Sequence, residues 1–128
     1  MNRLLEHVQP RIFSLCRKHR VRNLYAFGSV LTPRFTEQSD VDFLVDFKTE
    51  EISDYFTNFF ELKYALEDVV GREVDLVEEK AIRNPIFKRN VDRTKQRIYG
   101  CSSEILWSII INHLPILRRE VSALLGED

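Results

Sequence analysis

The hydrophobic positions of residues 3–18 recur every three or four residues, which is the spacing of one face of an α-helix. Pro10 lies inside this pattern and can kink a helix, but we expect one helix to continue to about residue 18. Two apolar runs follow, at residues 21–27 and 41–47, and each has the length of a β-strand. In the second run apolar residues alternate with others, which predicts that Asp40 and Asp42 share one face while the apolar set packs on the other.

A second helical pattern follows this pair of predicted strands. Ser53 or Asp54 can cap a helix that runs to about Val70, and Gly71 is suited to end it. The face of this helix that we expect to be buried contains Phe56, Phe59, Phe60, Leu62, Tyr64, Leu66 and Val69.

The last third of the chain contains one strand pattern followed by two helical patterns. Residues 72–77 alternate as a third strand does, and residues 86–98, which follow the break at Asn84-Pro85, predict a basic amphipathic helix. A further helical pattern covers residues 101–125, where Pro115 predicts a kink or a pair of helices. We therefore divide the chain into a domain at residues 1–100 and a helical tail at residues 101–128.

Composition and charge narrow the class of protein. A length of 128 residues, 44% of them hydrophobic and 30% charged, predicts one compact domain with a real core. The net charge of -1 argues against strong binding to nucleic acid or to an anionic membrane. The two cysteines, Cys16 and Cys101, cannot form a disulfide framework, and the N-terminus does not read as a signal peptide. We therefore expect a cytoplasmic protein that does not insert into a membrane.

The candidate chemistry lies where the first two predicted strands meet. Gly28 and Ser29 directly follow the first strand, and Asp40 and Asp42 stand at the start of the second. Asp75 lies inside the third strand, which a helical crossover can place beside the second. Three carboxylates that converge at one place repel one another unless cations neutralise them.

Magnesium ions suit this set of acids. Mg²⁺ prefers oxygen ligands and retains room for phosphate oxygens. Two such ions, about 3.5–4 Å apart, can stabilise the attacking and leaving oxygens of a phosphoryl transfer. Gly28 allows a phosphate to approach the backbone, the Ser29 hydroxyl can hydrogen-bond it, and Arg34 is available for a triphosphate tail. The pattern therefore predicts catalysis on a nucleoside triphosphate.

The same residues have simpler interpretations, and other phosphate-binding and calcium-binding motifs compete with this hypothesis. A lone Asp-x-Asp pair is common on protein surfaces, and a lone Gly-Ser pair is an ordinary turn, but their combination with Asp75 favours a catalytic site. The chain contains neither the Gly-x-x-x-x-Gly-Lys-Ser/Thr loop nor the Gly-x-Gly-x-x-Gly fingerprint. A calcium loop that began at Asp40 would need a ligand at Leu44 and a glycine at Val45.

At these residues the chain resembles the DNA polymerase beta-type nucleotidyltransferase superfamily, and more closely the minimal nucleotidyltransferases of prokaryotes. The resemblance implies an α/β fold with a mixed sheet of about three to four strands flanked by helices. It implies that Gly28 and Ser29 contact the triphosphate, that Asp40 and Asp42 bind both metal ions, and that Asp75 binds the ion that activates the attacking hydroxyl. Many relatives have an Arg-x-x-Arg pair after the Gly-Ser, whereas this chain has one arginine there.

The resemblance also implies a substrate and a partner. Minimal nucleotidyltransferases of the MntA type are antitoxins that transfer AMP from ATP to a tyrosine of a HEPN-type toxin, so we expect an Mg²⁺-dependent protein adenylyltransferase with such a partner. Two alternatives stay open: a binding antitoxin of the same fold without catalysis, and an enzyme that modifies a small molecule or RNA.

The tail has a resemblance of its own. Residues 101–128, with Trp107 and the Leu114-Pro115-Ile116-Leu117 segment, resemble the last helix of HepT-type HEPN proteins. No Arg-x4–6-His ribonuclease motif accompanies it, which argues against toxin activity of this chain itself. The tail is either a remnant of a fused partner or an ordinary helix that packs on the sheet or on a second subunit of a homo-oligomer.

Overall fold

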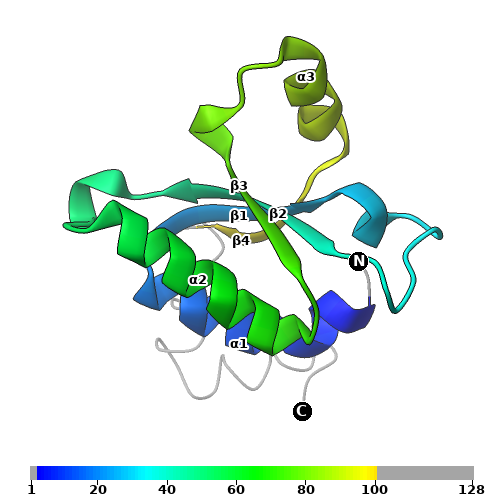
Figure 1. The fold of residues 1–128 in the computed structure, drawn as a ribbon, viewed down its shortest axis with the longest axis horizontal. Helices are drawn as coiled ribbons and strands as arrows, with labels where there is room; N and C mark the ends of the chain where they lie inside the picture. Colours follow the sequence, from blue (N-terminus) through cyan, green and yellow to red (C-terminus); the bar gives the residue numbers. More distant parts are fainter. Residues whose placement is uncertain (1–2, 101–128) are drawn as a thin grey trace, which may run out of the picture.

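The computed structural model describes residues 3–100, which form four strands, three α-helices and short 3₁₀ turns (Figure 1). The helices are α1 (Arg3–Lys18), α2 (Tyr55–Val70) and α3 (Pro85–Thr94), and the strands are β1 (Val21–Phe27), β2 (Val41–Phe47), β3 (Val74–Glu78) and β4 (Gln96–Gly100). Turns of 3₁₀ helix are η1 (Gly28–Leu31), η2 (Thr49–Glu51) and η3 (Glu79–Ala81). The predicted tail at 101–128 lies outside the described residues. No helix within residues 3–100 is long and apolar enough to cross a bilayer.

One mixed sheet organises these elements. Its strand order is β3-β2-β1-β4, in which β1 runs antiparallel to both of its neighbours and β2 runs parallel to β3. Helix α2 supplies the crossover between the two parallel strands, as parallel neighbours require. The predicted α/β fold with a mixed sheet of three to four strands is confirmed.

Each face of the sheet has its own apolar cluster. Helices α1 and α2 cover one face, where the alternate residues Val41, Phe43, Val45 and Phe47 of β2 lie in the main core. The opposite face carries a smaller cluster, in which Leu44 packs with residues from β1 and α3. Because side chains alternate along a strand, Asp42 lies on the same face as Leu44, toward α3. The predicted alternation of side chains along β2 is confirmed. The face that carries Asp42 and Leu44 is also partly covered, by α3.

Helix α2 begins and ends where the sequence indicates, and it buries part of the predicted face, because Leu62 and Leu66 are buried and Phe59 and Val69 pack against the core. The Asp54 carboxylate accepts a hydrogen bond from the Thr57 amide at the first turn, and Gly71 ends the helix with φ +71°. The predicted burial of Phe56 and Tyr64 is wrong, because these side chains are 72% and 56% exposed. Aromatic content misled the prediction, since the narrow contact with α1 and the sheet is made by Leu62, Leu66 and Val70.

The predicted helix at 86–98 is correct only for its first part. Helix α3 ends at Thr94, and the segment from Gln96 forms β4 against β1. Ile98 and Tyr99 are buried in the main core as a result. Pairing with β1 and burial of these two side chains outweigh a local pattern that suits a helix.

Candidate active site

A glycine turn connects β1 to the site. Gly28 has φ +76°, a conformation that side-chain-bearing residues rarely adopt. A Cβ atom at Gly28 would meet the Oδ2 atom of Asp42, so the missing side chain leaves room for that carboxylate. Thr32 closes the turn, because its amide and its hydroxyl each donate to the Ser29 carbonyl at 2.9 Å. The turn thus brings the backbone at Gly28 next to an acidic group, with the half-buried Ser29 following it in the same turn.

The sheet brings two of the predicted acids together. Asp42 of β2 pairs in register with Asp75 of β3 on one side and with Phe27 of β1 on the other. Asp40 lies just before β2 and is exposed, as is Asp75. Partial burial, together with the charges of Asp75 and Asp40, raises the pKa of Asp42 to about 6. Asp75 and Asp40 therefore both lie close enough to Asp42 to oppose its ionisation.

The chemistry of these acids fits a divalent cation. Within residues 3–100 no three His, Cys, Asp or Glu side chains are already grouped as a metal site, so the carboxylates would have to rotate inward to share an ion. Burial contributes most to the raised pKa of Asp42, and the negative charges of Asp75 and Asp40 raise it further, so a cation at this place would favour the ionised carboxylate. Oxygen donors from adjacent strands are the kind of ligand that Mg²⁺ takes. The residues present thus fit the expected metal ions.

The connection between η1 and β2 holds Arg34, the remaining predicted site residue. Arg34 is exposed on this connection, and its amide donates to the Thr32 hydroxyl at 3.2 Å. Its guanidinium does not line the cavity beside Gly28 and Asp42. Arg34 is therefore close to the Gly28 turn in sequence, but its side chain does not line the cavity that contains Gly28 and Asp42.

Arg72, which sequence reasoning missed, fastens the connection that leads to Asp40. Its Nη1 atom donates to the carbonyls of Thr36 at 2.8 Å and Ser39 at 3.2 Å, and its guanidinium lies 4.6 Å from the centre of the Phe35 ring. One guanidinium thus joins the connection at two carbonyls and at one aromatic ring, and its flat face is suited to the ring contact. Only tertiary structure reveals this role, because Arg72 follows α2 and is far from the connection in sequence.

Replacing Arg72 with Lys is expected to weaken the site while the fold persists. A lysine has a shorter reach and no planar group to lie over the Phe35 ring, so it would loosen the connection before Asp40, and we expect about 10-fold weaker Mg²⁺ affinity, as for other residues that orient metal ligands. Titration of Mg²⁺ dependence in an activity assay measures this effect. An Arg83→Lys substitution, at an exposed position on the segment before α3, is the matched control. Equal Mg²⁺ dependence in all three proteins would contradict the positioning role.

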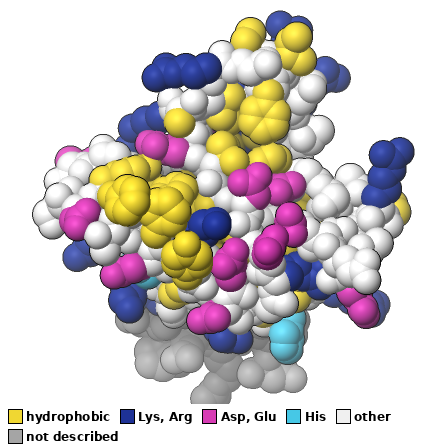
Figure 2. All heavy atoms as spheres, in the orientation of Figure 1, with side chains coloured by type: hydrophobic (Ala, Val, Ile, Leu, Met, Phe, Trp, Pro, Cys, Tyr) yellow, Lys and Arg dark blue, Asp and Glu magenta, His cyan; other side chains and the backbone are white. Residues whose placement is uncertain are grey.

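A cavity of about 620 Å³ opens beside the glycine turn. Figure 2 shows acidic side chains gathered below the hydrophobic side chains of the α3 region on this side of the molecule. The lining residues come from β1, the turn, β2 and α3: Phe27, Gly28, Asp42, Phe87, Asn90, Val91, Arg93 and Thr94. Sequence reasoning missed the contribution of α3, where it considered only the basic residues. The signal that could have revealed it is Phe87, the one aromatic residue of α3.

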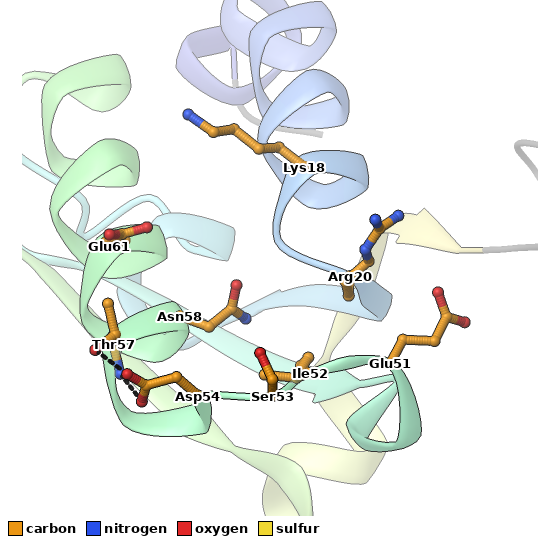
Figure 3. A pocket seen from close by; sticks show the side chains of 9 residues that line it. All are labelled: Lys18, Arg20, Glu51, Ile52, Ser53, Asp54, Thr57, Asn58 and Glu61. Atoms are coloured by element: carbon orange, nitrogen blue, oxygen red, sulfur yellow. Dashed lines mark hydrogen bonds between the residues drawn. The ribbon is translucent and has the colours of Figure 1, made fainter.

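A second hollow, of about 230 Å³, lies at the opposite end of β1 and β2 (Figure 3). Its lining residues carry charges of both signs: Lys18, Arg20, Glu51, Ile52, Ser53, Asp54, Thr57, Asn58 and Glu61. Asp54 is occupied by the α2 cap, where the Thr57 hydroxyl donates to it at 2.7 Å, and Asn58 donates to the His19 carbonyl at 2.8 Å. Asp54 and Asn58 therefore have structural roles, at the start of α2 and between α2 and the end of α1. The candidate active site is the other cavity, which contains Asp42.

Comparison with known proteins shows the family to which the chain belongs. Residues 13–99 match the model of the nucleotidyltransferase domain family. A Methanocaldococcus jannaschii protein named "Putative protein adenylyltransferase" is 43% identical over 75 residues, which are 59% of this chain and 74% of that protein. Protein adenylyltransferase MntA of Thermococcus cleftensis is 43% identical over 68 residues, which are 53% of this chain and 66% of the relative.

Solved structures share the fold. A structure described as a "putative minimal nucleotidyltransferase" superposes with a TM-score of 0.59 at 32% identity, over 75% of this chain and 95% of that one. A toxin-antitoxin structure with AMP-PNP gives a TM-score of 0.58 at 21% identity, over 92% and 95% of the two chains. A tri-AMPylated Shewanella oneidensis HEPN toxin in complex with its MNT antitoxin gives 0.54 at 20% identity, over 95% and 96%. The last two likenesses concern the fold alone.

Proposed function

Since this chain belongs to the nucleotidyltransferase domain family, as a minimal nucleotidyltransferase of the MntA type, we propose that it transfers AMP from ATP to a hydroxyl group of a HEPN-type toxin and thereby acts as an antitoxin. The observation that carries the proposal is the pairing of Asp42 with Asp75 beside the Gly28 turn. A domain that only bound a partner would have no need to gather carboxylates whose charges oppose one another.

Each residue of the site has a role in this reaction. Asp40, Asp42 and Asp75 would hold two Mg²⁺ ions, which lower the charge of the phosphates and favour an ionised acceptor hydroxyl. The Gly28 and Ser29 segment would bind the triphosphate tail, with Arg34 as a further contact if the connection closes. The acceptor oxygen forms a bond to the α-phosphorus while the bond from that phosphorus to the bridging oxygen breaks, and pyrophosphate leaves.

The relatives support the choice of nucleotide and acceptor. Two sequence relatives are named as protein adenylyltransferases, one of them MntA. Structural neighbours include a toxin-antitoxin complex with AMP-PNP and a HEPN toxin that carries AMP.

The test is a transfer assay with purified components. ATP labelled at the α-phosphate and at the adenine, Mg²⁺ and a HEPN protein encoded beside this chain should give a labelled HEPN protein whose mass rises by one or more AMP groups. Asp42→Asn should give no label. Neutralisation of the toxin without label, and unaffected by Asp42→Asn, would instead identify a binding antitoxin. Label on RNA or on a small molecule would identify a different acceptor.

Activity should fall as pH is lowered through about 6, because Asp42 must be ionised to bind a metal ion and its pKa is about 6 in the metal-free protein. Mg²⁺ and protons compete for the carboxylate, so a higher Mg²⁺ concentration should move the midpoint to lower pH. Profiles of kcat/KM between pH 5 and pH 8 at two Mg²⁺ concentrations measure this shift. If the midpoint of the pH profile did not change with Mg²⁺ concentration, the titrating group would not be Asp42.

A further inference from the structure

We propose that the cavity under α3 is the subsite for the nucleobase, and that Phe87 forms the surface on which the base stacks. This inference rests on the proposed function, because it specifies how the same site holds its nucleotide. It assigns a binding role to a helix to which sequence analysis gave none.

The position of the cavity fits this use. Gly28 and Asp42, at one end, are the residues proposed to act at the phosphates, while α3 forms the other wall. A nucleotide that extends from its phosphates along the cavity therefore carries its base to α3. The volume of about 620 Å³ lies within the range of about 300–1,000 Å³ that is usual for small-molecule sites.

The chemistry of the α3 wall suits a flat aromatic ring. Phe87 is 40% exposed, and its ring centre lies 6.0 Å from that of Phe27 at an interplanar angle of 75°. Phe27, which itself belongs to the buried cluster, therefore supports the Phe87 ring edge to face, while part of that ring stays open to the cavity. Polar atoms for the edge of a base or for a ribose are available on Asn90, Arg93 and Thr94.

Helix α3 is also held firmly enough to form a binding wall. Asn84 caps it, since the side-chain oxygen accepts hydrogen bonds from the amides of Ile86 at 2.9 Å and Phe87 at 3.2 Å. At the other end, Lys95 Nζ lies 3.0 Å from a carboxylate oxygen of Glu79 and 3.0 Å from one of Asp92, and 4.3 Å from the centre of the Tyr25 ring. These contacts fix α3 to η3 and to β1, so Phe87 is positioned before a nucleotide binds.

The experiment compares two competitors that share phosphates but differ in the base. A fluorescent ATP analogue is displaced from the full chain, in Mg²⁺, by ATP or by inorganic tripolyphosphate. We expect ATP to displace it at a lower concentration than tripolyphosphate does. Phe87→Leu, which keeps an apolar side chain against Phe27, should weaken displacement by ATP by about 10-fold, the scale of one base-aromatic stack, and leave tripolyphosphate unchanged.

Two further variants make the result specific. Phe87→Tyr keeps the ring and should restore ATP affinity. Ile86→Ala removes a neighbouring side chain that is 68% exposed and does not line the cavity, and it should change nothing. Far-UV circular dichroism confirms that each variant is folded before affinities are compared.

The outcomes separate this inference from the proposed function. If ATP and tripolyphosphate both fail to bind the unaltered protein in Mg²⁺, the proposed nucleotidyl transfer itself is wrong. If ATP binds but Phe87→Leu weakens neither competitor, or weakens both equally, the base lies elsewhere. If Phe87→Leu leaves ATP affinity intact and raises only the KM for the protein acceptor, the cavity belongs to the acceptor, and the nucleobase assignment is overturned.

Discussion

Replacing Asp42 with Asn is expected to reduce nucleotidyl transfer by about a thousandfold. The substitution keeps the shape of the side chain but removes the central charge of the three carboxylates. A metal ion contributes several kcal/mol to stabilisation of the transition state, and about 1.4 kcal/mol corresponds to each factor of ten in rate. Single-turnover transfer of labelled AMP measures the loss. Asp46→Asn, at the opposite end of β2 on the same face, is the control and should retain transfer.

The same substitution should stabilise the metal-free protein at neutral pH. Burial and the charges of Asp75 and Asp40 raise the pKa of Asp42 from its ordinary 3.8 to about 6 in the folded protein, which therefore binds this proton more tightly than the unfolded chain does. Stability contributed by the protonated form is therefore lost as pH rises from about 4 through about 6. Asn carries no such charge, and the Tm of Asp42→Asn should exceed that of the unaltered protein at pH 7 without Mg²⁺. Equal Tm values at pH 7 would show that the ionised Asp42 carboxylate costs the folded protein no stability.

Replacing Gly28 with Ala is expected to lower both stability and activity. The left-handed backbone conformation at φ +76° costs about 1–2 kcal/mol for a residue with a Cβ atom. The added methyl group would also meet the Asp42 carboxylate, which would have to move away from its place beside Asp75. Denaturant unfolding and the transfer assay measure the two effects, and we expect transfer to fall by about a hundredfold, as when a fixed polar partner of the reacting group is lost.

Gly71→Ala separates these two contributions. Gly71 has nearly the same conformation, at φ +71°, but a Cβ atom there would meet no atom within 4 Å. This variant should therefore lose stability through backbone strain alone and should keep its activity. If Gly28→Ala lost no more activity than Gly71→Ala, the close approach of the turn to Asp42 would have no functional importance.

Local patterns were sufficient for much of the fold. The runs at 21–27 and 41–47 are strands with the predicted bounds, because alternation of side chains is a property of the strand itself. Gly71 and Asp54 mark the ends of α2, since caps depend on a few neighbouring residues. The same approach was wrong about Phe56, Tyr64 and the segment after Thr94, where burial and strand pairing depend on distant parts of the chain.

The candidate site was predictable as a set of residues, and the helical crossover also predicted that Asp75 lies beside Asp42, which the structure confirms. Gly28, Ser29, Asp40, Asp42 and Asp75 stand out by their types and spacing, and their catalytic roles remain a prediction. The sequence by itself determined the strands at 21–27 and 41–47, the ends of α2 and the set of candidate residues. Tertiary structure alone decided that the segment after Thr94 pairs with β1, that Arg72 holds the connection before Asp40, and that Phe87 lines the same cavity as Asp42. Each of these relations joins residues far apart in the chain, and only the packed sheet and helices bring them together.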